Sequence, residues 1–259
     1  MKGIRLEEKT WEEAAKAIED SGGVAILPIG SVEQHGKHLP LGTDSYVAQG
    51  ISEAASAATG AVLIPPMWFG WCPHHMVLPG TVTIRPEILI EYLYDVLGSL
   101  SAHGLKKVVL VNGHRIVNIV WMQIAAQKAQ EAFGIRAVIF DPAYMSKEIV
   151  SALDFGPVGH AEEIETSHML HMHEHIVHMD RAIDNPVKKT ERYSVDPSYA
   201  LDTLCYVPSR KSDQEKHAKE SGGTSGSPTK ADKNKGEQYH DHLVQRMVEV
   251  IEELRRKDV

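Results

Sequence analysis

Short apolar runs alternate along the first 140 residues with longer segments in which apolar side chains recur at helical spacing. The runs lie at 24–28, 61–64, 107–111 and 135–140, and glycine, proline or polar residues bound each of them. A continuous apolar run of this length, set off by turn residues, is typical of a strand that is covered on both faces. The pattern therefore predicts four buried strands.

Helical segments fill the intervals between these runs. Thr10 and Glu13 have the spacing of a capping box, which predicts a first helix ending near residue 19. We expect further helices at about 45–58 with Asp44 as its cap, from Pro86 to about 104, at about 117–133, and at about 235–256. Strands that alternate with helices imply right-handed crossovers and a parallel sheet. The expected fold is a single three-layer α/β/α domain over residues 1–259 with a mainly parallel central sheet.

Acidic residues and histidines follow three of the four predicted strands. Glu33, His35 and Asp44 come after the first strand, His114 follows the third, and the segment 160–165 follows the fourth. Ligand sites in parallel sheets form beyond the carboxyl ends of the strands, so these distant segments should meet at one edge. Their nitrogen and oxygen ligands suit zinc, manganese or iron. The ordinary alternative is that Asp44 only caps a helix and His114 only hydrogen-bonds within a loop.

Three motifs in this order carry a family resemblance. They are Ser31-Val32-Glu33-Gln34-His35-Gly36 with Leu39-Pro40 and Asp44, then Asn112-Gly113-His114, then His160-Ala161 with Glu165-Thr166-Ser167. Together they resemble the creatininase family of dinuclear metal hydrolases, over about residues 20–180. The resemblance implies two divalent metal ions (zinc, manganese or iron), with Asp44 shared between them. It assigns Glu33 and His114 to one ion and His35 to the other.

The second ion needs a further carboxylate, and here the sequence departs from the family pattern. Creatininase has this ligand two residues after the histidine that matches His114, where this chain has Ile116. The resemblance points to Glu165 as the substitute, with Glu163 as the alternate. The departure argues against creatinine itself as the substrate. His160 matches the family's proton-transfer histidine, and an imidazole with a pKa near neutrality can accept or donate a proton in hydrolysis.

Several residues are candidates for contact with the substrate. Arg115 stands where the family commonly has glycine, and its guanidinium would suit a carboxylate, a phosphate or several oxygens. The alternative is an ordinary arginine at the start of a helix. The loop Trp68–Thr81 is similar to the family's substrate-covering loop, so four of its residues are expected to line the pocket: Trp68, Trp71, His74 and His75. These aromatic residues could instead form a subunit contact. For the histidines at 168–178 we favour a structural or interface role.

The resemblance favours a hydrolase that uses a metal-activated water to cleave an amide C–N bond in a small polar, cyclic substrate. An alternative is hydrolytic C–C ring opening of a cyclic diketone such as a dehydro-inosose. Arg115 and the isoleucine at 116 fit such an oxygen-rich ring at least as well as a lactam. Two further alternatives are a metal-binding scaffold without activity and an α/β protein without metal.

Composition narrows the partners and the compartment. A net charge of −8 without a basic stripe argues against nucleic acid, and no apolar run reaches the roughly 20 residues that span a bilayer. Only two cysteines, far apart in sequence, make the cytoplasm the expected location. The Pro-, Lys-, Ser- and Gly-rich stretch at about 184–236 is expected to be a long, partly mobile excursion. The family resemblance implies a homo-oligomer, often a hexamer, acting on a small molecule.

Overall fold

The computed structural model describes residues 2–186, 193–194, 205–206 and 208–256. Within them a five-stranded sheet has the order β1-β3-β2-β4-β5, and every neighbouring pair is parallel. Its strands are β1 (Ile4–Arg5), β2 (Val24–Ile29), β3 (Val62–Leu63), β4 (Lys107–Asn112) and β5 (Arg136–Phe140). The four predicted strands are confirmed. The sequence pattern missed β1, because Ile4 is followed by Arg5 and no apolar run marks the strand, whereas the equally short β3 lies within the run 61–64. A separate pair consists of β6 (Tyr193–Ser194) and β7 (Cys205–Tyr206).

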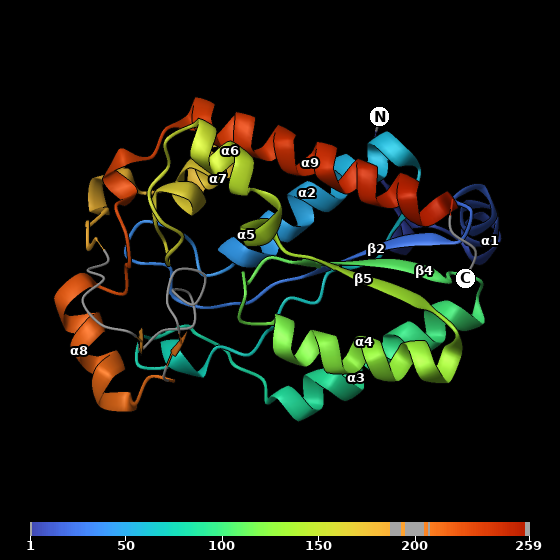
Figure 1. The fold of residues 1–259 in the computed structure, drawn as a ribbon, viewed down its shortest axis with the longest axis horizontal. Coiled ribbons are helices and arrows are strands. Elements are labelled where there is room, and N and C mark those ends of the chain that lie inside the picture. Colours follow the sequence, from blue (N-terminus) through green and yellow to red (C-terminus); the bar gives the residue numbers. More distant parts are fainter. Residues whose placement is uncertain (1, 187–192, 195–204, 207, 257–259) are drawn as a thin grey trace.

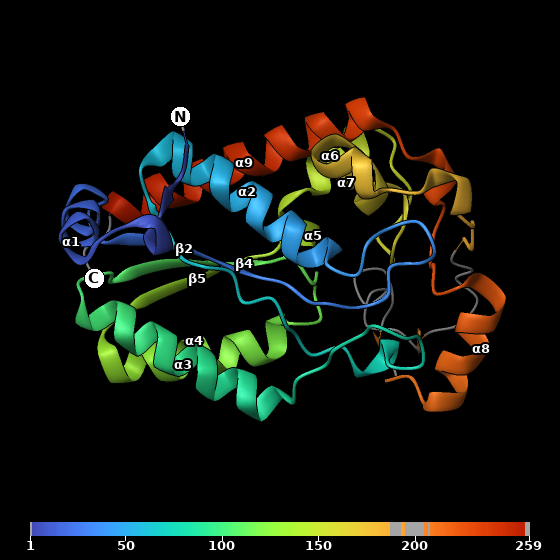
Figure 2. The same ribbon diagram turned by 180° about the vertical axis from the view of Figure 1, so that it is seen from behind.

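Helices cover both faces of the five-stranded sheet, so the predicted three-layer α/β/α architecture is confirmed (Figures 1 and 2). One layer contains α2 (Thr43–Thr59), α7 (Glu163–His173) and α9 (Lys233–Arg256). The opposite layer contains α3 (Pro86–Ala102) and α4 (Ile119–Phe133). Helices α1 (Trp11–Asp20) and α8 (Lys211–Ser221) lie at opposite ends of the molecule.

The neighbouring strands β2 and β4 contribute side chains to two hydrophobic cores, one on each face of the sheet. Successive side chains of β4 point to opposite faces, so Val109 and Val111 pack under α2 and α9, whereas Val108 and Leu110 pack against α3 and α4. Burial on both faces explains why these strands are apolar without interruption. Each such side chain contributes about 1.5–3 kcal/mol of hydrophobic stabilisation. The cores thereby fix the carboxyl ends of β2 and β4, where the candidate ligands begin.

The helix starts show one confirmed cap and one wrong prediction. The capping box of α1 is present: Glu13 N–H donates to Thr10 Oγ1 at 3.3 Å, and Thr10 N–H donates to Glu13 Oε2 at 2.8 Å. Asp44, in contrast, does not cap α2. The N-cap is Gly42, and Asp44 lies inside the first turn of the helix. Its carboxylate is therefore available for other contacts.

Two short helices, α5 (Pro142–Met145) and α6 (Lys147–Ala152), carry the chain from β5 towards the 160–165 segment. Single 3-10 turns complete the described structure: η1 (Leu6–Glu8), η2 (Pro73–His75), η3 (Glu174–Ile176), η4 (Met179–Arg181) and η6 (Pro228–Lys230). Among the described residues, no helix is both long and apolar enough to cross a membrane.

The stretch expected to be a long, partly mobile excursion has a different character in its described part. Helix α8 occupies 211–221, and Ser221, Thr224 and Ser225 are buried. The Ser- and Gly-rich sequence after α8 therefore packs into the protein. The remaining residues of the predicted excursion fall partly outside the described ranges.

Candidate metal centre

The register of the sheet brings the two main motifs together. Ile29 at the end of β2 pairs with Asn112 at the end of β4, so the loops that follow leave the sheet side by side. Gly113 permits close contact between the second loop and α2. A Cβ atom at this position would lie 1.9 Å from the carbonyl oxygen of Asp44. Any other residue would push His114 away from Asp44.

Asp141, which follows β5, shapes the turn that contains His114. Its Oδ2 accepts hydrogen bonds from Asn112 Nδ2 at 2.8 Å and from the backbone N–H of Ile116 at 2.7 Å. Ile116 has a φ of 69°, which is unfavourable for a β-branched residue and is kept by the surrounding contacts. The backbone strain is thus located two residues after a candidate ligand.

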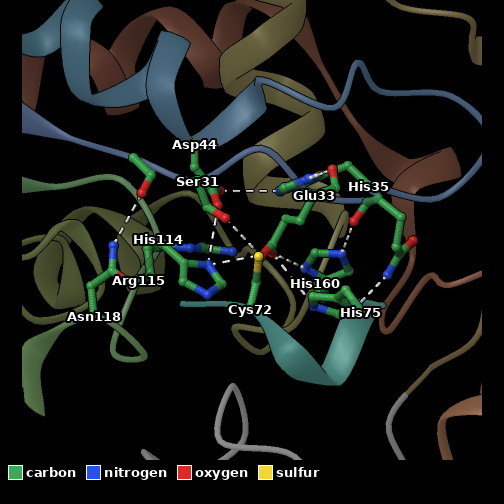
Figure 3. Close-up of polar contacts among 12 residues, drawn as sticks. Ser31, Glu33, His35, Asp44, Cys72, His75, His114, Arg115, Asn118 and His160 are labelled. Atoms are coloured by element: carbon green, nitrogen blue, oxygen red, sulfur yellow. Dashed lines mark hydrogen bonds and ion pairs between the residues drawn. The ribbon is translucent and has the colours of Figure 1, made fainter. Parts of the chain in front are cut away.

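Four candidate ligands meet at this edge of the sheet, and all are buried (Figure 3). Asp44 contacts two imidazoles: His35 Nε2 lies 3.1 Å from Oδ1, and His114 Nδ1 lies 3.1 Å from Oδ2. His114 Nδ1 is also 3.3 Å from Glu33 Oε1. One atom each of Glu33, His35 and Asp44 lie within 4.8 Å of one another, a spacing that can hold a metal ion.

Glu165 and Glu163 lie in different surroundings. Glu165 Oε2 is 3.8 Å from His35 Nε2, and together with His160 these residues form a second group with ligand atoms within 4.8 Å. The carboxylate of Glu163 instead accepts hydrogen bonds from Lys235 Nζ at 3.1 Å and from the backbone N–H of Gly156 at 3.1 Å. The geometry places Glu165, and not Glu163, beside the other candidate ligands.

His160 and His75 stack on each other within the same cluster. Their ring centroids are 4.1 Å apart with an interplanar angle of 22°. His160 Nε2 lies 2.5 Å from the carbonyl oxygen of Gln34, which can only accept, so Nε2 carries the hydrogen. In the neutral ring, Nδ1 is then the basic nitrogen, and it lies 3.7 Å from Glu33 Oε1. Glu33, His75 and His160 form a third group of possible ligands.

Arg115 is buried among carboxylates. Its Nη2 contacts Glu165 Oε1 at 2.6 Å and Glu162 Oε1 at 2.8 Å, and it donates to the carbonyl of Gly159 at 3.3 Å. Only a small part of its surface is open to solvent. The guanidinium therefore contacts one oxygen of Glu165, Oε1, while the other, Oε2, is the one nearest His35. Contact with a substrate, expected from the sequence, remains a prediction.

The two tryptophans expected to line a pocket have separate positions. Trp71 is half-buried and lines a cavity of about 350 Å³ next to His74 and Ile116. Trp68 is 37% exposed and its ring meets Tyr46 edge-on, with centroids 5.6 Å apart. Trp68 thus covers the start of α2, whereas Trp71 faces a cavity beside the site.

Burial and close ion pairs shift the ionisation of the cluster. Burial lowers the pKa of His35, but Asp44 outweighs it and the net pKa is about 10. Burial likewise opposes a charge on His114, but Glu33 and Asp44 raise its pKa to about 9. Burial raises the pKa of Glu33 to about 7. Protons on the imidazoles therefore balance the buried carboxylates when the protein holds no metal.

The donor set fits divalent metal ions. Glu33 Oε1 and His75 Nε2 are buried 3.4 Å apart, and within the described part of the chain neither makes a hydrogen bond. Leaving buried polar atoms unpaired is costly, and a bound cation would satisfy them. Three carboxylates and several imidazoles are the ligands that zinc, manganese and iron accept.

The sequence did not assign a role at the site to several residues that contact it. Ser31 Oγ donates to Glu33 Oε2 at 3.0 Å, and the buried Cys72 lies near the same carboxylate, which together with burial raises the pKa of its thiol (Figure 3). The segment after α8 also packs against the site. Gln34 Nε2 donates to Gly223 O at 3.1 Å, and Ser225 exchanges two backbone hydrogen bonds with His160. No local signal marks residues so far from the motifs.

Taken together, the molecule is a parallel α/β protein whose sheet edge carries a buried cluster of carboxylates and imidazoles suited to divalent metal. Comparison with known proteins gives the family. The family profile described as "Creatininase: Creatinine amidohydrolase" matches residues 7–251. The chain belongs to the creatininase family of hydrolases, as the motifs predicted.

Individual relatives have different activities. The chain is 29% identical to 3-dehydro-scyllo-inosose hydrolase of Thermotoga maritima over 195 residues, which are 72% of this chain and 61% of that enzyme. It is 24% identical to creatinine amidohydrolase of Pseudomonas putida over 213 residues, or 76% and 82% of the two chains. It is 37% identical to the mycofactocin precursor peptide peptidase of Mycolicibacterium smegmatis, but over only 35% of this chain and 39% of that one.

Solved structures show the same fold. A crystal structure of creatinine amidohydrolase superposes with a TM-score of 0.82 at 24% identity and covers all of both chains. A structure titled "Creatininase Mn" gives a TM-score of 0.80 at 24% identity over 98% of this chain and 100% of the other. The expected creatininase-like fold is confirmed.

Proposed function

We propose that the protein is a dinuclear metal hydrolase that cleaves an amide C–N bond. The observation that carries the proposal is the position of Asp44, whose two carboxylate oxygens each face one imidazole, His35 or His114. A carboxylate placed in this way can be shared by two ions. The relatives named creatinine amidohydrolase and mycofactocin precursor peptide peptidase support amide cleavage.

The residues divide between two metal positions. Glu33 and His114 would hold one ion and His35 and Glu165 the other, with Asp44 between them. Zinc, manganese and iron all suit these ligands. When bound, two such ions lower the pKa of a shared water and polarise a substrate carbonyl. Cys72 and Ser31 lie next to Glu33, and the hydrogen bond from Ser31 orients the carboxylate of Glu33.

His160 is the proposed proton-transfer residue. Its Nε2–H is held by the carbonyl of Gln34, which fixes the ring and leaves Nδ1 directed to the side of Glu33. Nδ1 can take a proton during attack and return it to the leaving nitrogen. The stacked His75 limits rotation of the ring and shields it from water.

Arg115 has a positioning role in this proposal. A guanidinium that contacts Glu165 and Glu162 holds both carboxylates in place. Burial raises the pKa of Glu165, and the charge of Arg115 opposes that rise. Contact between Arg115 and a substrate remains a prediction. It would require a substrate oxygen to reach the buried Nη2.

Hydrolytic C–C ring opening is the second candidate. It is favoured by the similarity to 3-dehydro-scyllo-inosose hydrolase, which extends over 72% of this chain. The metal-loaded enzyme should be assayed with cyclic amides, peptide amides and 3-dehydro-scyllo-inosose. Turnover of an amide supports the first candidate, and turnover of the inosose alone replaces it with the second.

We further propose a homo-oligomer in the cytoplasm. The loop between β3 and α3 exposes Trp68, Phe69 and Met76, and such side chains are often covered by a neighbouring subunit. The low cysteine content supports the compartment. The mass of the protein in solution tests the oligomer.

A further inference from the structure

A cavity of about 350 Å³ adjoins the metal centre and is lined mainly by apolar side chains. Its walls include Trp71, Ile116, Val117, Val120 and Tyr144. The first comes from the loop after β3, the next three from the turn and helix that follow His114, and Tyr144 from α5. A concave, mostly apolar site with polar groups at one end is the usual form of a small-molecule pocket.

His74 joins this cavity to the metal centre. It is one of the lining residues, and its ring stacks on His114 with centroids 5.8 Å apart and an interplanar angle of 13°. Its centroid is also 4.1 Å from that of His75. Only the ring of His74 therefore separates a molecule in the cavity from His114, a candidate ligand of the metal.

The turn after β4 builds the inner wall of the cavity. Ile116 and Val117 follow His114 and Arg115 directly, and Asp141 fixes the left-handed backbone of Ile116. The strained turn thus positions a ligand of the metal and two apolar cavity residues at once. A fully hydroxylated ring would meet few hydrogen-bond partners on this wall.

We propose that this cavity binds an apolar group of the substrate, close to the scissile carbonyl. The inference rests on the proposed function and narrows it to amides that carry a hydrophobic side group of the size of a leucine or phenylalanine side chain. The polar end of such a substrate lies at the metal centre and the apolar end against Trp71 and Val120. Val120 and Tyr144, 58% and 47% exposed without an occupant, would then be partly covered.

A matched pair of hydroxamates tests the cavity without requiring turnover. Phenylacetohydroxamic acid and acetohydroxamic acid share a metal-binding head and differ only by a phenyl ring. Their affinities for the metal-loaded enzyme are measured by isothermal titration calorimetry. Burial of a phenyl ring should make the first ligand bind roughly tenfold or more tightly than the second.

Two substitutions on α4 test whether the preference for the phenyl compound arises in this cavity. Val120 is exposed, so Val120→Asp should fold; it is expected to abolish the preference for the phenyl compound and to leave the affinity for acetohydroxamate unchanged. Ile124→Asp is the matched control. Ile124 is also exposed on α4, one turn further on, and does not line the cavity, so this variant should keep the preference.

The outcomes separate the two proposals. Equal affinities of the wild-type enzyme for both hydroxamates overturn the apolar pocket and leave the metal hydrolase intact. Failure of both compounds to bind contradicts the metal centre, and the pocket proposal falls with it. The masses of wild type and Val120→Asp in solution are measured in parallel, so that a change of oligomeric state is detected. If Val120→Asp changes the oligomeric state while the preference for the phenyl compound persists, the surface is a contact between copies of this chain and the proposal is wrong.

Discussion

Asp44 and His114 are 70 positions apart in the sequence, and in the folded chain Asp44 Oδ2 lies 3.1 Å from His114 Nδ1. The contact depends on the parallel pairing of β2 with β4 and on the glycine at 113, whose hydrogen side chain lets the turn reach the carbonyl of Asp44.

Glu165 and Glu163 should differ in their effect on metal content. Glu165→Gln removes a charged ligand beside His35 and is expected to reduce the bound metal from two ions to one per chain. Glu163→Gln is the matched control and should keep both, because that carboxylate contacts Lys235 and the backbone of Gly156. Elemental analysis of the two purified variants, with circular dichroism as a check of folding, makes the comparison. Equal metal contents would contradict the assignment.

His160→Ala should separate chemistry from metal binding. Loss of the proton-transfer imidazole is expected to lower kcat by about 100- to 10,000-fold, with the metal content unchanged. Steady-state kinetics on the best substrate, together with elemental analysis, provide the test. Loss of metal in this variant would instead make His160 a ligand, as its place in two of the candidate groups allows. Unchanged turnover would show that His160 is not the proton-transfer residue. Absence of turnover in the metal-loaded wild type would support the scaffold without activity.

Arg115→Leu should destabilise the fold. It leaves Glu162 and Glu165 buried without their cation, and removing one partner of a buried ion pair costs about 3–5 kcal/mol. Urea unfolding of the metal-free protein measures the change. Lys16→Met breaks an exposed pair with Asp20 and should have far less effect. Equal stability of wild type and Arg115→Leu would show that the guanidinium does not compensate these carboxylates.

Metal uptake should release protons. The pKa of His35 is raised from its ordinary 6.5 to about 10 and that of His114 to about 9, so both rings are protonated at pH 7 in the metal-free protein. A ligating imidazole must be neutral, so binding expels these protons and metal affinity rises with pH up to about pH 10, where His35 also becomes neutral. Calorimetry in buffers of different ionisation enthalpy counts the protons. Uptake without proton release, or affinity that falls between pH 7 and 9, would be inconsistent with these shifts.

The sequence was sufficient to predict the strands that form a continuous apolar run and the helices in which apolar residues recur at helical spacing. The run around Val108–Val111 is buried on both faces, and such strands are continuous in the sequence because both cores require apolar side chains. The strand Ile4–Arg5 was missed because it contains a charged residue and lies in no apolar run, whereas Val62–Leu63, of the same length, lies within one. The capping of α2 was assigned to Asp44 because aspartate commonly caps helices. The N-cap is Gly42, and Asp44 lies within the first turn, where it contacts His35 and His114.

The site was predictable where the ligand residues of a motif follow a strand. It was not predictable where a residue acts on the backbone or comes from another part of the chain. Glu33, His35 and His114 sit directly beyond β2 and β4, so their convergence follows from parallel pairing. Asp141 and Ser225 are different. Asp141 acts through the backbone of Ile116, and Ser225 belongs to a polar, Gly-rich stretch whose composition favoured mobility. Only tertiary packing reveals such contacts.

The most direct test of the account is anomalous diffraction at metal absorption edges from crystals of the purified protein. The account predicts two ions per chain, both within coordination distance of Asp44, one beside His35 and the other beside His114. A cluster without ions after incubation with zinc or manganese, or a single ion away from Asp44, would contradict it.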